Sequence, residues 1–123
     1  MKEQAMNELS RMEVRADDII QYGYIAVKQF PKSEKFVLAT RITDLMWEMA
    51  ALISSAIDAQ YNSDKIRLMK EADKELRKLR IMVRNSMKLG FLPFQKYEYW
   101  SKLNDELGRM IGAWMHQISN RKG

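Results

Sequence analysis

The sequence predicts an all-α protein, an antiparallel up-down-up-down four-helix bundle, on three grounds. Two prolines and five glycines interrupt 123 residues that are otherwise rich in the helix-favouring Leu, Met, Ala, Glu and Lys. Apolar residues recur at intervals of three and four along four segments, about 6–29, 34–60, 64–89 and 95–120. The connections between these segments are short, and short connections make neighbouring helices run in opposite directions.

The composition limits the kinds of site that the chain can hold. Its 123 residues are expected to form one domain, 1–123, which can bury a core without disulfide bonds or metal. There is no cysteine, and the one histidine, His116, has Gly112 one turn before it, so no thiolate site or paired-histidine zinc site is expected. The first residues lack the apolar core of a signal peptide, and the apolar region 45–59 is too short to span a bilayer. We therefore expect a soluble intracellular protein without metal or cofactor.

The first predicted helix, 6–29, has one apolar face that is expected to enter the core. It ends at Phe30-Pro31, because proline disfavours helical geometry in the residue before it and has no N–H to donate. Ser33 is then expected to cap the second helix. The apolar positions of the first helix are Leu9, Met12, Ala16, Ile19, Ile20, Gly23, Val27 and Phe30.

The second predicted helix, 34–60, is apolar around most of its circumference. A helix in a lone bundle needs an apolar stripe over only roughly a third to a half of its surface. We therefore expect part of this helix to contact another subunit. The apolar set is Leu45, Met46, Trp47, Met49, Ala50, Leu52, Ile53, Ala56 and Ile57.

A Gly-Pro loop separates the last two helices. Gly90 is expected to end the third helix in the left-handed conformation, and the apolar loop 90–94 is expected to pack against the bundle. On the fourth helix Gly108 and Gly112 lie one turn apart. Each interior glycine costs about 0.8–1.0 kcal/mol of stability relative to alanine, so we expect another helix to approach them closely.

The third predicted helix, 64–89, carries the net charge and the candidate binding residues; Asn62 or Ser63 is expected to cap it. It holds nine of the 21 basic and four of the 16 acidic residues, and nine minus four equals the +5 of the whole chain. At 100° per residue eight of the nine cations share one arc, nearly opposite the apolar residues, and Lys65 is the exception. The candidate binding residues on this arc are Lys70, Lys74, Arg77, Lys78, Arg80, Ile81, Arg84 and Lys88.

Two features of the arc favour a nucleic-acid interface over a solvated helix face, which is the alternative for any basic helix. Like charges follow one another at intervals of four, as in Lys70, Lys74 and Lys78, and each such pair destabilises a helix by about 0.2–0.5 kcal/mol. A polyanion would relieve this repulsion. Ile81 lies among the cations, where an apolar side chain suits contact with a macromolecule. We expect salt-sensitive, weakly sequence-specific binding of RNA or DNA.

The sequence contains no phosphate-binding glycine loop, nucleophile motif or positioned acid–base pair, so we expect no catalytic residue and no enzymatic activity. Most of the ten methionines fall on apolar stripes and are expected in the core. Trp47, Trp100 and Trp114 are expected to anchor the core or an interface. A purely structural, self-assembling bundle without a ligand is a further alternative.

The motif Phe30-Pro31-Lys32-Ser33-Glu34-Lys35-Phe36, followed by Leu38 and Ile42, resembles that of one protein family. Together with the apolar second helix, the basic third helix and the aromatic-rich fourth helix, it is similar to Avd, the accessory variability determinant of diversity-generating retroelements, over nearly the whole chain. Small four-helix proteins encoded in ribosomal RNA intervening sequences share a similar break, but they usually carry Pro and Gly soon after it. Residues 40–57 contain neither, which favours the retroelement family.

The resemblance implies a homopentameric barrel of four-helix bundles without catalytic activity, acting in the cytoplasm and encoded by a bacterium or a phage. Proteins of this family bind the reverse transcriptase and nucleic acid, and they support mutagenic retrohoming, the mutagenic copying of template RNA that diversifies a target gene. The alternative is an intervening-sequence-type protein that binds RNA generically or has another role. The basic surface of the family matches this chain best at Arg77, Arg80 and Arg84, and extends to Lys70, Lys74 and Lys78.

Overall fold

The computed structural model of the protein describes the backbone of residues 2–120 and the side chains of residues 11–120. These residues form helices and loops without a strand, so the predicted all-α class is confirmed. None of their helices contains an apolar run that could span a bilayer. Four long helices and one short helix follow one another along the chain: α1 (Lys2–Val27), α2 (Lys32–Lys35), α3 (Leu38–Asp58), α4 (Asn62–Lys88) and α5 (Phe94–Asn120).

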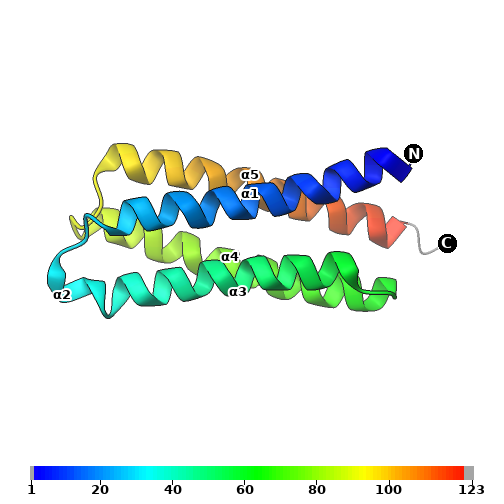
Figure 1. Ribbon diagram of the computed structural model, residues 1–123, viewed down its shortest axis with the longest axis horizontal. Coiled ribbons are helices and arrows are strands. Elements are labelled where there is room, and N and C mark those ends of the chain that lie inside the picture. The colour runs from blue at the N-terminus through cyan, green and yellow to red at the C-terminus, as the bar shows by residue number, and fades with distance from the viewer. Residues whose placement is uncertain (1, 121–123) are drawn as a thin grey trace.

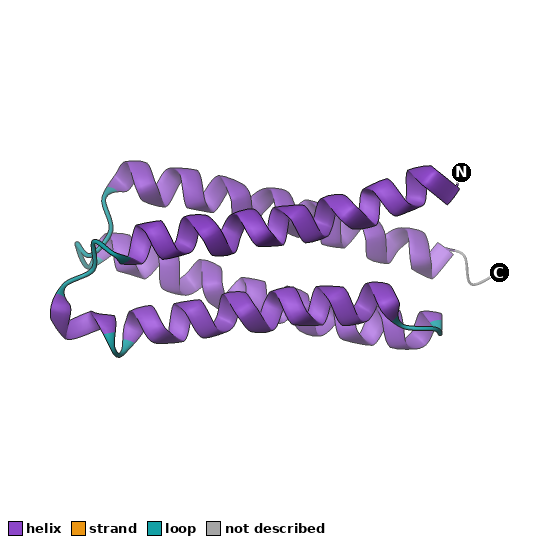
Figure 2. Ribbon diagram, viewed as in Figure 1, coloured by secondary structure: helices purple, strands orange, loops and turns teal. Residues whose placement is uncertain are grey.

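The four long helices lie side by side as a bundle (Figure 1). α3 packs against α1 and α4, and α5 packs against α4 and α1. The loops are confined to the ends of the bundle (Figure 2). The connections from α1 to α3 and from α4 to α5 share one end, and the connection from α3 to α4 lies at the other, with the start of α1 and the end of α5. The apolar core therefore fills the space that all four helices enclose.

α1 buries the apolar face that its sequence predicts. The helix begins at Lys2, earlier than expected, and ends at Val27, before the predicted break at Pro31. The predicted core position Leu9 lies outside the residues whose side chains are described. The other predicted positions are all buried: Met12, Ala16, Ile19, Ile20, Gly23, Val27 and Phe30.

The second predicted helix, 34–60, is divided in the structure, and Ser33 does not cap it. Ser33 lies inside α2, a single turn that follows Pro31, and neither α2 nor α3 begins with a side-chain cap. Proline has the backbone angle that a helix start requires (φ −57° for Pro31), so it opens this turn without help from the serine. The chain departs from ideal helical angles at Phe36 (φ −99°, ψ 0°) and at Val37 (φ −117°, ψ −79°), and Val37 is a β-branched residue with a low helix propensity.

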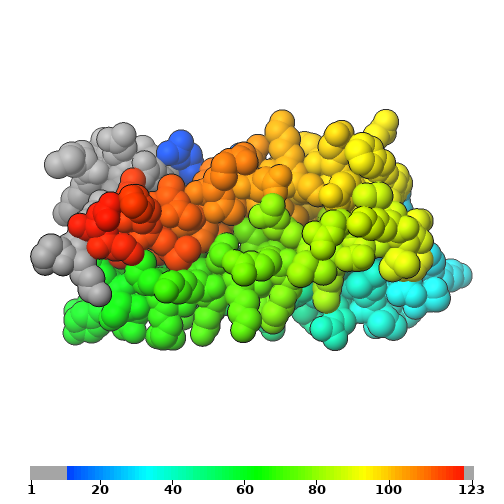
Figure 3. Space-filling model, turned by 180° about the vertical axis from the view of Figure 1, so that it is seen from behind, coloured from blue at the N-terminus to red at the C-terminus, as the bar shows by residue number. Residues whose placement is uncertain are grey.

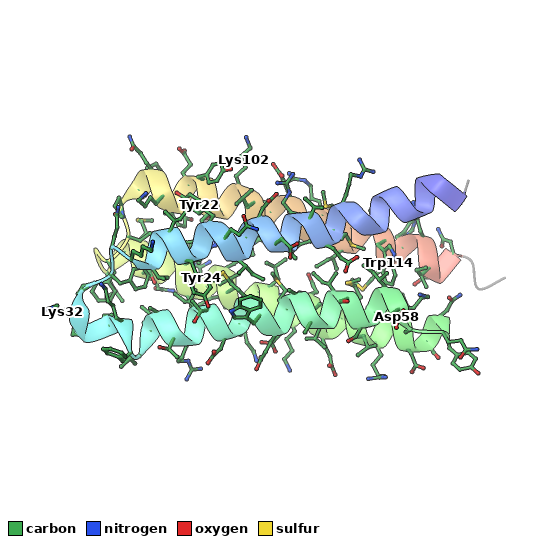
Figure 4. The ribbon with its side chains drawn as sticks, in the orientation of Figure 1. Tyr22, Tyr24, Lys32, Asp58, Lys102 and Trp114 are labelled. Atoms are coloured by element: carbon green, nitrogen blue, oxygen red, sulfur yellow. The ribbon has the colours of Figure 1, made fainter. Side chains whose placement is uncertain are left out.

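The position of α3 between α1 and α4 accounts for most of its apolar surface. Because α3 contacts two neighbouring helices, a larger part of its surface is buried than the single apolar stripe assumed from the sequence. Trp47 is still 55% exposed, and its indole N–H donates a 2.9 Å hydrogen bond to the Tyr24 hydroxyl, which reaches across from α1 (Figure 4). The subunit contact expected from this apolar set therefore depends on Trp47. The others are buried (Leu45, Met46, Met49, Ile53, Ala56) or half-buried (Ala50, Leu52, Ile57).

The start of α4 differs from the prediction. The helix begins at Asn62, so the predicted caps Asn62 and Ser63 lie in its first turn, and the residue before it, Tyr61, makes no side-chain cap bond. Lys65, the cation outside the basic arc, donates a 2.7 Å hydrogen bond from Nζ to the carbonyl of Ile57 in the last turn of α3. This lysine therefore supports the α3–α4 connection instead of joining the basic face.

The loop from α4 to α5 agrees with the prediction. Gly90 ends α4 with a positive φ of 84°, a conformation that glycine adopts without steric cost. The rings of Phe91 and Phe30 lie 6.2 Å apart between centroids, and Leu92 is 3% exposed. The first residues of the loop therefore pack onto the end of the bundle, while Phe94 is exposed.

α5 contributes its aromatic and aliphatic stripe to the core. Trp100 is fully buried, and Trp114 lies within the bundle (Figure 4). A Cβ added at Gly108 would lie 3.4 Å from Nη1 of Arg80 on α4, so this glycine adjoins a neighbouring helix as predicted. No described atom of another helix lies within 4 Å of such a Cβ at Gly112, so the described residues do not make the expected close approach there.

Candidate nucleic-acid interface

α4 separates its basic and apolar residues onto opposite faces, as the helical angles predict. All eight candidate binding residues lie on this helix with exposed side chains, and Ile81 among them is 46% exposed. The opposite face enters the core between α3 and α5. Its residues are buried (Met69, Ala72, Leu76, Leu79, Val83) or half-buried (Met87).

A groove of about 720 Å³ runs between α4 and α5, along the side of the basic face of α4 that is nearer to α5. The two helices form the surface seen from behind in Figure 3, with α5 above α4. We call this feature the α4–α5 groove. It brings four of the eight candidates together with side chains of α5. Its lining consists of Asp73, Leu76, Arg77, Arg80, Ile81 and Arg84 from α4 and Asp105, Gly108 and Arg109 from α5.

The other four candidates lie outside this groove. We call Lys70, Lys74, Lys78 and Lys88 the lysine ridge. Lys78 pairs with Glu75 at 3.4 Å, and none of the other three has a carboxylate of the described residues within 4.0 Å. The row of like charges therefore exists, and one carboxylate, that of Glu75, offsets part of the repulsion within it.

The arginines of the α4–α5 groove fall into two kinds. Arg77 pairs with Asp73 of the same helix at 3.4 Å, and Arg80 pairs with Asp105 of α5. No carboxylate of the described residues lies within 4.0 Å of Arg84 or Arg109. The guanidinium groups of Arg84 and Arg109 are thus available to an external anion, whereas those of Arg77 and Arg80 are each paired with a carboxylate.

Gly108 explains how the groove stays open beside Arg80. Its position on α5 faces α4, where an added Cβ would lie 3.4 Å from Arg80 Nη1 and 3.8 Å from Leu76 Cδ2. A larger side chain at this position would occupy the floor of the groove. The glycine therefore lets the Arg80 side chain lie across α5 and meet Asp105.

Sequence reasoning missed Arg109 and Asp105. Periodicity assigns residues to a face of their own helix, but it does not say which face of another helix lies beside them. The position of Arg109 next to Gly108, which was expected to adjoin a neighbouring helix, was the one available signal.

The described residues contain no group of three or more acidic or histidine side chains placed to hold a metal ion. His116 is exposed, and its Nε2 lies 3.1 Å from the side-chain amide nitrogen of Asn120 one turn later on α5. The lysines and arginines of the basic face can attract anions electrostatically and donate hydrogen bonds to them.

Sequence and structure comparisons agree with this architecture. A sequence model of the bAvd-like family matches residues 10–118. No curated protein is significantly similar to the chain. A solved structure of unknown function, from the S23 ribosomal protein family of Bacteroides thetaiotaomicron VPI-5482, is similar with a TM-score of 0.81 and 16% identity, over 89% of this chain and 98% of that chain. This likeness concerns the fold alone.

The resemblance to Avd that the motif after the first helix predicts is therefore confirmed at the level of the family. The match extends from the first turns of α1 to the last turn of α5. The chain belongs to the bAvd-like family.

Proposed function

We propose that this protein is a non-enzymatic accessory factor of a diversity-generating retroelement. It binds RNA or cDNA through the basic face of α4, binds the reverse transcriptase, and supports mutagenic retrohoming as a homopentamer of antiparallel four-helix bundles. The observation that carries the proposal is the α4–α5 groove, where Arg77, Arg80 and Arg84 of α4 and Arg109 of α5 line one open surface. Family membership supplies the biological setting.

The chemistry of these side chains suits phosphate. Each guanidinium presents several N–H donors in a plane and can bind two phosphate oxygens at once. Neutralising phosphates releases counterions, so affinity falls as salt rises. If four phosphates of a single strand are neutralised, raising salt from about 50 to 200 mM lowers the affinity about 50-fold. Gel mobility shift across this range tests the expectation, and indifference to salt contradicts it.

Charge reversal tests whether the groove is the binding surface. We expect the triple variant Arg77→Glu, Arg80→Glu, Arg84→Glu to bind RNA about 100-fold or more weakly, because each change replaces a phosphate contact with a repulsion. The control is the triple variant that changes three exposed lysines near the end of α1 and in α2 to glutamate, which alters the net charge equally. Its residues are Lys28, Lys32 and Lys35.

If the folded arginine variant binds RNA and polymerase as the wild type does, the three arginines are not the binding surface. If the wild type binds neither RNA nor polymerase, the remaining interpretation is a structural bundle that only assembles. Co-purification with the reverse transcriptase, with and without nuclease treatment, separates direct protein binding from bridging by RNA. The genomic neighbourhood tests the intervening-sequence alternative: a reverse transcriptase gene beside paired template and variable repeats supports the retroelement role, and a position within a ribosomal RNA gene contradicts it.

A further inference from the structure

Asp105 is an acidic residue of the α4–α5 groove that also lines a neighbouring hollow. It pairs with Arg80 across the two helices, and the side chains of this pair are 47% (Arg80) and 43% (Asp105) exposed. Asp105 and Arg109 also line a second hollow along α5, whose rim includes Lys102, a side chain directed away from the bundle (Figure 4). The carboxylate therefore lies at the junction of two surface hollows, among the cations of both.

A carboxylate in this position competes with phosphate for the same donors. An ion pair exposed to solvent contributes little to stability, so it can be exchanged for another anion at small cost. Asp105 is fixed to its helix, however, and it stays in the groove when Arg80 turns to an external ligand. Its charge then repels a phosphate held by Arg84 or Arg109, which have no carboxylate partner among the described residues.

We propose that the α4–α5 groove binds the phosphodiester backbone of a polynucleotide and that Asp105 is its built-in competitor. In the free protein Asp105 holds Arg80, and a polynucleotide displaces it and takes Arg80 together with Arg84 and Arg109. The inference deepens the proposed function and rests on it, because it assigns the phosphate contacts to a groove shared by two helices and adds a residue that lowers affinity. Asp73 also lines the groove, but it pairs with Arg77 of its own helix and not across the two helices.

The test is the substitution Asp105→Asn, which removes the charge and keeps the size of the side chain. We expect affinity for a labelled single-stranded RNA at about 50 mM salt to rise about three- to tenfold, since one ion pair no longer opposes binding. The slope of log affinity against log salt should steepen by about 0.7, because the groove loses one negative charge and neutralises one more phosphate charge of the single strand. The matched control is Asp44→Asn, the same change at an exposed position of α3.

The coupling with Arg80 provides a second measurement. In an Arg80→Gln background the gain from Asp105→Asn should shrink, because the donor that the carboxylate occupied is gone. Circular dichroism of each variant checks that the helices are retained.

Two results overturn the inference and leave the proposed function intact, provided that the triple arginine variant loses RNA binding. In one, Asp105→Asn binds no more tightly than Asp44→Asn, and the carboxylate is not a competitor. In the other, Asp105→Asn binds more weakly, and Asp105 orients Arg80 for the ligand instead. If neither the wild type nor Asp105→Asn shifts RNA at low salt, both the inference and the RNA-binding function are wrong. If Asp105→Asn strengthens binding to the polymerase alone, the groove serves a protein partner.

Discussion

Two glycines on long helices have opposite surroundings, and this difference sets the tolerance of each position. At Gly23 of α1 an added Cβ would lie 2.4 Å from Sδ of Met46 and 3.1 Å from Cζ2 of Trp100, both fully buried side chains. At Gly112 of α5 no described atom lies within 4 Å of such a Cβ. The first glycine allows three helices to meet closely, and none of the described residues of another helix packs against the second.

We predict that Gly23→Ala destabilises the protein and that Gly112→Ala stabilises it. Alanine gains about 0.8–1.0 kcal/mol over glycine in a helix interior, which is the expected effect at Gly112. At Gly23 overpacking costs about 1–3 kcal/mol. The end of Met46 can shift, but the buried Trp100 ring has little room, so we expect a net loss of about 1 kcal/mol in the free energy of unfolding by urea.

Each glycine result has a clear contrary outcome. A stabilised Gly23→Ala variant would show that Met46 moves away at little cost. A destabilised Gly112→Ala variant would indicate that Gly112 packs against another chain, as its spacing from Gly108 first suggested.

The end of α4 shows how one residue type stops a helix and turns the chain. The N–H of Gly90 bonds to the carbonyl of Met87 at 3.0 Å, and the N–H of Phe91 bonds to the carbonyl of Ser86 at 2.9 Å. This pair of bonds is the Schellman motif, and it requires a left-handed residue, here Gly90 with φ 84°. The motif brings Phe91 back onto the bundle, where its ring lies near that of Phe30.

We predict that Gly90→Ala lowers the free energy of unfolding by about 1–2 kcal/mol, because an L-residue in the left-handed region brings its Cβ against the backbone. Space is not the cause, since no described atom lies within 4 Å of an added Cβ. Gly90→Asn should lose less, because asparagine tolerates this conformation better. Equal losses for the two variants in thermal or urea unfolding would contradict this backbone explanation.

For the whole molecule, the apolar surface that stays exposed bears on the proposed assembly. The bundle buries most of the apolar set of α3, but Trp47 remains 55% exposed, paired edge-on with Tyr24 of α1 at 6.4 Å between ring centroids. An exposed tryptophan is a residue type enriched in protein interfaces. Trp47 is therefore the position of α3 at which to probe contact between chains.

We predict that the mass by light scattering at micromolar concentration is about five times the 14.5 kDa of one chain, and that Trp47→Asp lowers it. Trp47→Phe is the control, because it keeps an apolar ring while removing the N–H that bonds to Tyr24. A monomeric wild type would contradict the proposed assembly. An unchanged mass for a folded Trp47→Asp variant would place the contact elsewhere on the surface.

The fold was predictable to the extent that it depends on local chemistry. The break at Pro31 and the stop at Gly90 follow from backbone restrictions that act within a few residues, and both are present in the structure. The interruption at Val37 was missed because apolar periodicity continues across it. Most of the apolar excess of α3 is buried within the bundle, because the burial of a helix depends on how many neighbours it has, and Trp47 alone of the predicted set is exposed.

The candidate site was likewise predictable only where it depends on one helix. Helical periodicity is enough to place the cations of α4 opposite its apolar residues, since each residue turns by a constant angle from the last. It cannot separate the groove arginines from the lysine ridge, nor can it find Asp105 and Arg109. That separation comes from the packing of α5 against α4 at Gly108, a contact between residues far apart in the chain. Such contacts depend on how the surfaces of two helices fit together, and the periodicity of a single helix does not encode that fit.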